Sequence, residues 1–83
     1  MQSVSLSKSP KEKPVIVADI TGDPELCYRL EEIGFVPGSS VEVIAKLPFN
    51  GPIACKIRGA NYALRREDAD AILVTDYSEY SRN

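Results

Sequence analysis

Hydrophobic residues recur along this chain in short runs, and three of these runs have the two-residue period of a strand buried on one face. Residues 40–46 (SVEVIAK) and 53–58 (IACKIR) alternate between apolar and polar side chains. Residues 61–65 (NYALR) alternate less completely. This period places successive side chains on opposite faces of a sheet, so each run predicts a strand with one buried face.

Two further runs are almost continuously apolar. Residues 15–20 (VIVADI) predict a first strand with contacts on both faces. The second apolar run, residues 71–74 (AILV), predicts the closing strand. The polar residues 66–71 (REDADA) before it predict one short helical turn. About five short strands joined by tight turns favour closure into a small barrel, because closure hides strand edges. The pattern therefore predicts an all-β, SH3-like barrel with one short helix after the first strand. An OB-fold is the alternative, although its helix usually comes later in the chain.

One segment has the period of a helix. Leu26, Leu30 and Ile33 recur at i, i+4 and i+7, which places them on one helical face. Asp23 is a favourable N-cap residue. Pro24 suits the first helical position because its missing N–H would have no partner there. We therefore expect a helix that begins near residue 24 and buries this apolar stripe.

The helix is expected to end at Gly34, in the left-handed conformation that glycine adopts at a C′ position. Phe35 would then fold back on Leu30. Pro37-Gly38 suits a type II turn, which needs a positive φ at its third residue. We assign a structural role to this stretch and to the glycine of a later reversal at 59–61: Leu30, Gly34, Phe35, Pro37, Gly38 and Gly59.

The remaining signals set the domain boundaries. Asn50-Gly51 is a strong hairpin signal between two of the predicted strands. Residues 1–13 predict a flexible N-terminal arm, from which Leu6 can dock on the folded body. Residues 76–83 predict a polar tail, and residues 14–75 the one folded domain.

Composition narrows the function. The net charge is −2 and the pI is about 5, which argues against a nucleic-acid partner. The chain has no histidine, and neither a nucleophile–base pair nor a phosphate-binding loop stands out. An enzyme is therefore not expected. The N-terminal residues lack the apolar region of a signal peptide, and no apolar run has the length of a membrane span. We expect a cytoplasmic protein with reduced thiols.

The two cysteines, Cys27 and Cys55, fall at positions predicted to be buried. One cysteine pair without CxxC spacing and without histidine is a poor metal site. We therefore expect no metal site and no cofactor, with at most weak binding of Fe(II) or another divalent metal.

Side chains near the predicted turns are candidates for contact with a partner. Phe49 lies near the tip of the hairpin LPFNGPI, where an exposed aromatic ring would favour interaction. An inward-packed Phe49 is the equal alternative. The stretch KIRGANYALRR gathers Arg58, Tyr62 and Arg65 around the next hairpin. Basic groups beside a tyrosine suit phosphate or an acidic partner, and an ordinary mixed surface is the alternative.

Three motifs in this order and spacing resemble the FeoA family, the ferrous iron transport protein A group. They are RL..IGF.PG at 29–38, P..GPI at 48–53 and RG..YALR..DA..I.V at 58–74. The resemblance covers residues 14–75. The segment before residue 15 departs from the family pattern, so we do not expect a first edge strand around Leu6.

The resemblance implies an SH3-like barrel that serves as a small cytoplasmic accessory of FeoB, the membrane ferrous iron permease with a GTPase domain. The implied partner is the cytosolic part of FeoB, without direct membrane insertion and without nucleic acid. For that contact we predict Phe49, Arg58, Tyr62 and Arg65. The same barrel is found at the end of DtxR-type repressors, so a stand-alone metal-responsive regulatory domain is the alternative function.

Overall fold

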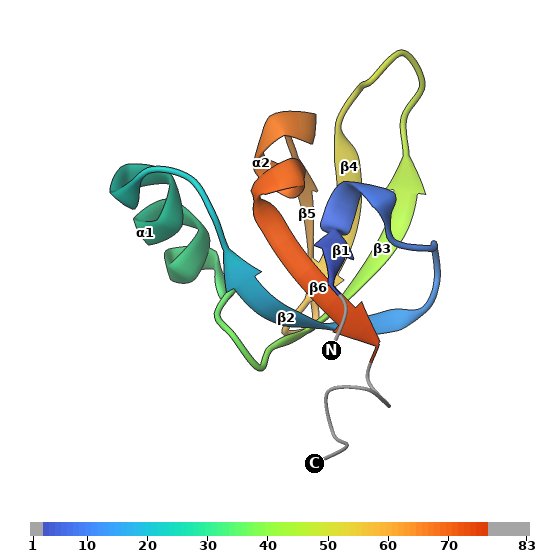
Figure 1. Cartoon of the computed structure of the whole chain (residues 1–83). Coiled ribbons are helices and arrows are strands. Elements are labelled where there is room, and N and C mark those ends of the chain that lie inside the picture. The colour runs from blue at the N-terminus through green and yellow to red at the C-terminus, as the bar shows by residue number, and fades with distance from the viewer. Residues whose placement is uncertain (1–2, 77–83) are drawn as a thin grey trace.

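The alternating segments of the sequence form the strands of one antiparallel sheet that curls around a core (Figure 1). The computed structural model describes residues 3–76. Its strands follow the order β1-β6-β2-β3-β4-β5 across the sheet. The elements along the chain are β1 (Val4–Ser5), the 3-10 helix η1 (Leu6–Lys8), β2 (Pro14–Ile20), α1 (Pro24–Ile33), β3 (Ser40–Lys46), β4 (Ile53–Ile57), β5 (Ala60–Leu64), α2 (Arg66–Ala71) and β6 (Ile72–Asp76).

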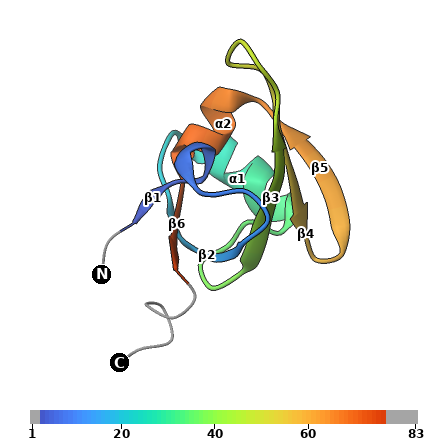
Figure 2. The same cartoon turned by 90° about the vertical axis from the view of Figure 1, so that its right-hand side faces the viewer.

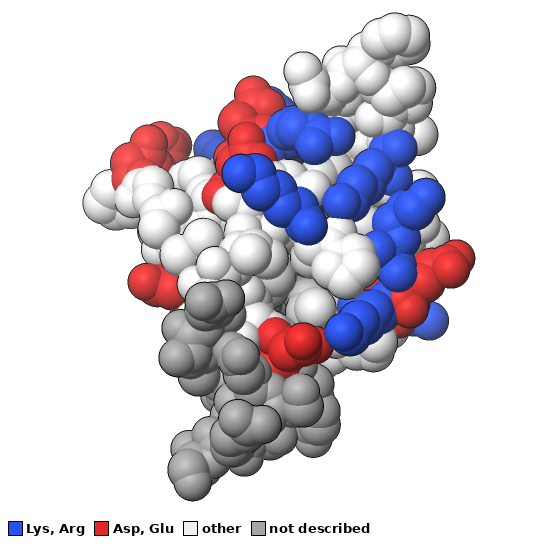
Figure 3. All heavy atoms as spheres, turned by 45° about the vertical axis from the view of Figure 1, so that its right-hand side comes forward, with Lys and Arg blue, Asp and Glu red and all other residues white. Residues whose placement is uncertain are grey.

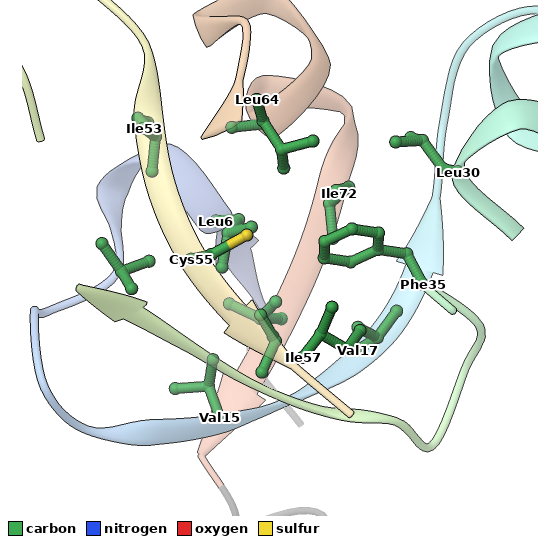
Figure 4. Packing of buried hydrophobic residues seen from close by; sticks show 14 residues of the cluster. Leu6, Val15, Val17, Leu30, Phe35, Ile53, Cys55, Ile57, Leu64 and Ile72 are labelled. Atoms are coloured by element: carbon green, nitrogen blue, oxygen red, sulfur yellow. The ribbon is translucent and has the colours of Figure 1, made fainter. Parts of the chain in front are cut away.

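The core lies inside the curl and is built from the inward faces of the strands. Every strand except β1 contributes at least one buried aliphatic residue to it, and β4 contributes three side chains, Ile53, Cys55 and Ile57. The Phe35 ring is directed into this cluster from the segment after α1 (Figure 4). The SH3-like, mainly β fold predicted from the alternation is confirmed, with six strands in place of about five.

The local signals around α1 act as predicted. The Asp23 carboxylate accepts a hydrogen bond from the Leu26 N–H at 2.8 Å, which satisfies a helix N–H that has no partner within the helix. At the other end Gly34 has a φ of 127°, and the Phe35 N–H donates to the Leu30 carbonyl at 3.0 Å. This backbone bond turns the chain back over the helix end and carries Phe35 into the core.

The turn that follows is also confirmed. The Ser39 N–H donates to the Val36 carbonyl at 2.9 Å, and Gly38 has a φ of 97°. A positive φ at this third position is the requirement that glycine meets in a type II turn. The chain therefore enters β3 in a fixed direction, with Val41 and Val43 inward.

The N-terminal segment differs from the expected flexible arm. Val4 and Ser5 form β1, which pairs with β6, and Leu6 is fully buried. The Ser7 hydroxyl donates to the Asp70 carboxylate of α2. Leu6 docks as expected, but the edge strand that we did not expect beside it is present. Apart from Asp76, which ends β6, the predicted tail lies outside the described residues.

Candidate partner-binding surface

The hairpin between β3 and β4 projects from the body of the protein (Figures 1 and 2). The Leu47 N–H donates to the Pro52 carbonyl at 3.1 Å, and the Gly51 N–H donates to the Pro48 carbonyl at 3.0 Å. Phe49 and Asn50, between them, have φ values of 60° and 56°. Positive φ at both central residues is the geometry of a type I′ turn.

The centre of this turn lies one residue earlier than the predicted Asn50-Gly51. A turn centred on Asn50-Gly51 needs the N–H of Pro52 for its closing hydrogen bond, and proline has none. Gly51 supplies that N–H instead. The missing donor is visible in the sequence, so the position of the turn was predictable from Pro52.

Phe49 occupies the tip of the turn and is 98% exposed. The structure therefore excludes the inward-packed alternative. A bulky residue at positive φ is an uncommon backbone conformation that costs free energy. Its ring makes no contribution to the core that offsets this cost. An observed outlier of this kind is a reason to look for function.

Apolar and basic side chains lie below the tip. Leu47 is 49% exposed at the base of the turn, and Lys46 ends β3 directly before it. Lys11 forms an isolated bridge with Val43, which brings the N-terminal segment beside β3. On the face shown in Figure 3, Lys and Arg side chains gather below the uncharged hairpin. The sequence indicated Leu47 as a residue near the loop tip, but not Lys46 or Lys11. The position of Lys11 beside β3 depends on the long-range bridge to Val43.

The second hairpin joins β4 to β5 through two residues. Arg58 and Gly59 have φ values of 56° and 80°, and Ile57 pairs with Ala60. The reversal therefore lies at 58–59 and not at 59–61, because the regular pairing of β5 begins at Ala60. A two-residue loop with positive φ at both positions is the common connection between antiparallel strands.

Arg58 is held against the end of α1. A Cβ atom placed on Gly34 would lie 2.6 Å from Cδ of Arg58 and 3.3 Å from its Nη1. The last turn of α1 contains no basic residue of its own. A cationic side chain at this position interacts favourably with the negative end of the helix dipole. Arg58 thus has a structural role that the sequence did not reveal.

The four residues predicted for partner contact do not form one cluster. β4 separates Phe49 at its beginning from Arg58 at its end, and five strand residues span about 17 Å. Tyr62 lies midway along β5, opposite Cys55, and is 36% exposed. Arg65 follows Leu64, which pairs with Ile53. The structure therefore places Arg65, and not Arg58, toward the Phe49 end.

The family of this chain follows from its sequence and its fold together. A family model, the FeoA domain, matches residues 4–76. The chain belongs to the FeoA family. The match begins at β1, so the family domain includes the N-terminal segment that we had placed outside it. A search of curated protein sequences gave no significant match.

Solved structures agree with this membership. The FeoA-like protein from Clostridium acetobutylicum has a TM-score of 0.82 and 25% identity, and the match covers 100% of this chain and 96% of that one. FeoA from Stenotrophomonas maltophilia, complexed with zinc and described as a prokaryotic SH3 domain protein, has a TM-score of 0.75 and 28% identity, covering 87% and 89%. A manganese-dependent transcriptional repressor with manganese has a TM-score of 0.84 and 28% identity, covering 92% of this chain and 37% of the repressor.

The cysteines of this FeoA-family chain lie in different environments. Cys55 is fully buried on β4, and burial raises the pKa of its thiol to about 11. Cys27 is half-buried on α1, with its Sγ 4.0 Å from the carbonyl oxygen of Ile20. Within residues 3–76 no three Cys, Asp or Glu side chains gather as a metal would require. Similarly, no helix in that range is long and apolar enough to cross a bilayer.

Proposed function

We propose that this protein is a small cytoplasmic accessory of ferrous iron uptake that docks on the cytosolic part of FeoB and modulates transport. Membership of the FeoA family supports this proposal. The S. maltophilia relative has been proposed as a bacterial ferrous iron transport activating factor. The proposed activity is recognition of a protein partner, without catalysis by this chain.

The observation that carries the proposal is the position of Phe49. Its ring is 98% exposed at the tip of a hairpin that stands away from the core. Burial of a phenylalanine side chain contributes about 1.5–3 kcal/mol. The folded monomer forgoes that contribution, and a partner with an apolar pocket regains it. Aromatic anchors of this kind are enriched at protein interfaces.

The surrounding side chains would form the rim of the contact. Leu47 extends the apolar surface at the base of the hairpin, and Lys46 adds positive charge beside it. Tyr62 lies on the adjoining strand β5, and Arg65 lies between β5 and α2; both are further contributors that we propose. Arg58 contributes least, because its side chain packs along Gly34 at the opposite end of β4.

Calorimetric titration of the protein into the cytosolic domain of FeoB tests this proposal. Phe49→Ala is expected to weaken binding about tenfold or more, which corresponds to about 1.4 kcal/mol. The matched control is Tyr28→Ala, which removes an aromatic ring that is 64% exposed on α1, away from the hairpin (Figure 1). The control should bind as the unaltered protein does. Absence of binding by the folded, unaltered protein would contradict the proposal.

A second candidate function is a metal-responsive regulatory domain, favoured by the similarity to the manganese-dependent repressor. Calorimetry of the purified chain with Fe(II) and with Mn(II) separates the two. The binding-module proposal predicts only weak metal binding, because the described residues contain no ligand cluster. Stoichiometric binding at micromolar metal would favour the regulatory domain.

A further inference from the structure

One end of the sheet is open. β5 is the last strand in the order β1-β6-β2-β3-β4-β5, and its only strand neighbour in the described part of the chain is β4 (Figure 2). Four of its five residues are exposed, and only Leu64 is buried. The opposite end of the sheet is β1, which has two residues and leads into η1. β5 is therefore the longer of the two edges.

The backbone of β5 leaves two residues with hydrogen-bonding groups directed away from the sheet. The two-residue loop makes Ile57 and Ala60 a hydrogen-bonded pair, and such pairs alternate along an antiparallel ladder. Asn61 and Ala63 are the non-bonded positions, so their N–H and C=O groups point away from β4. Two residues at this spacing are what an added strand needs to form a regular ladder.

β5 lacks the features with which proteins usually protect an edge. Edge strands are commonly interrupted by proline, by a bulge or by charged side chains. The strand ANYAL has no proline and no charge, and its five pairs with β4 run without a register shift. β2 and β3, in contrast, both contain a register shift. The open edge is therefore regular, uncharged along its length and free of proline.

The charges around this edge are positive at both ends. Arg58 precedes β5, and Arg65 and Arg66 follow it. Lys56 lies opposite Asn61 on the neighbouring strand. Arg65 is exposed, and a carboxylate at the end of an added strand is a suitable acceptor for its guanidinium group.

We propose that β5 binds an extended, acidic segment of another protein by strand addition, with backbone bonds at Asn61 and Ala63 and carboxylates beside the flanking arginines. A second copy of this chain fits less well. Antiparallel pairing of two β5 strands about Tyr62 would place Arg66 of one copy opposite Arg58 of the other, and like charges in that position are destabilising. The proposal does not depend on docking to FeoB.

The probe is a capped peptide, ETVTVTE, titrated into the ¹⁵N-labelled protein, with KTVTVTK as the charge-reversed control. The acidic peptide is expected to shift the amide signals of Asn61 and Ala63 and to slow their hydrogen exchange. The basic peptide should bind more weakly by about tenfold or more, because its end charges oppose the arginines. Equal binding of the two peptides, or shifts confined to other elements, would overturn the proposal.

A pair of variants tests the backbone contribution. Ala63→Pro removes one outward N–H at a position where an edge strand tolerates proline, and Ala63→Ser retains that N–H. The proline variant should lose peptide binding about tenfold relative to the serine variant. Phe49→Ala should leave peptide binding unchanged, which separates this result from the test of FeoB docking. If the proline variant does not fold, the peptide comparison on the unaltered protein still decides.

The oligomeric state of the protein is a further test of the strand-addition proposal. Sedimentation of the unaltered protein should give a monomer at the concentrations of the titration. A dimer that Ala63→Pro dissociates would assign the edge to a second copy and overturn the acidic-segment proposal.

Discussion

At the scale of single residues, two of the turn glycines are required for different physical reasons. Position 34 requires glycine for two reasons: its φ is 127°, and the side chain of Arg58 occupies the space that a Cβ would take. Gly59 is required for its conformation alone, since its φ is 80° and, apart from its two chain neighbours, no residue in the range 3–76 has an atom within 4 Å of the point that a Cβ would occupy. The first requirement joins two segments that are distant in sequence, and the second is local.

Substitution of these glycines by alanine measures the difference. Gly59→Ala should lower the free energy of unfolding by about 1–2 kcal/mol, the cost of a left-handed conformation. Gly34→Ala should cost more, about 3 kcal/mol or above, because steric contact with Arg58 adds to backbone strain. Urea unfolding measures both. Arg58→Ala introduced into the Gly34→Ala variant should recover part of the loss, and equal costs for the two glycines would contradict this account.

The buried thiol of Cys55 makes stability depend on pH. Burial raises its pKa from 9.0 to about 11. Between these values the folded protein retains a proton that the unfolded chain releases, so this contribution to stability is complete below pH 9.0 and is lost as the pH rises toward 11. In urea unfolding, the difference in the free energy of unfolding between the unaltered protein and Cys55→Ala should become smaller from about pH 8 to about pH 10. Cys27→Ala is the control for loss of a thiol, and a difference that stays constant with pH would contradict the prediction.

At the scale of elements, short-range signals predicted well wherever their partners are close in sequence. Three signals depend only on residues that are close together in the sequence: the Asp23 cap, the Gly34 helix end and the Pro37-Gly38 turn. Both hairpin turns begin one residue earlier than predicted. Asn50-Gly51 was chosen for its residue types, but the missing N–H of Pro52 moves the turn to Phe49-Asn50. The exposure of Phe49 depends on the whole hairpin and was undecided in the sequence.

The hairpin geometry predicts that Phe49 is present for a reason other than stability. Phe49→Gly removes an exposed ring at a φ of 60°, where glycine is not strained. The variant should keep the fold and raise the free energy of unfolding by up to about 1 kcal/mol. Thermal unfolding measures this, with Leu47→Gly as a control at the base of the hairpin, where no positive φ is relieved. A marked loss of stability in Phe49→Gly would show that the ring supports the fold.

At the scale of the whole molecule, the N-terminal segment completes the core that the central strands begin. Leu6 is fully buried among residues from β2, β3, β4 and β6 in the same cluster, and β1 adds to the edge of β6. The sequence around Leu6 has no periodicity that predicts its burial, because a two-residue strand and a short 3-10 helix are too short to show a period. Its placement depends on contacts with residues far along the chain, such as the bond from the Ser5 hydroxyl to the Asp70 carbonyl, 65 positions later.

Leu6→Ala should therefore destabilise the protein by about 2–4 kcal/mol, through lost burial and a residual cavity. Val4→Ala is the matched control, because Val4 lies two residues earlier and is 48% exposed. It should change the free energy of unfolding by about 0.5 kcal/mol or less. Chemical denaturation of the two variants measures the contrast. If Leu6→Ala were as stable as the control, the N-terminal segment would not belong to the core.

The most direct test of the central claim, that a passive surface around the β3–β4 hairpin recognises FeoB, is an NMR titration of the ¹⁵N-labelled protein with the cytosolic domain of FeoB. The account predicts the largest changes in the amide signals of residues 47–51, with smaller changes at Arg65 and little change in α1. A titration without changes, or with changes centred on α1, would contradict it.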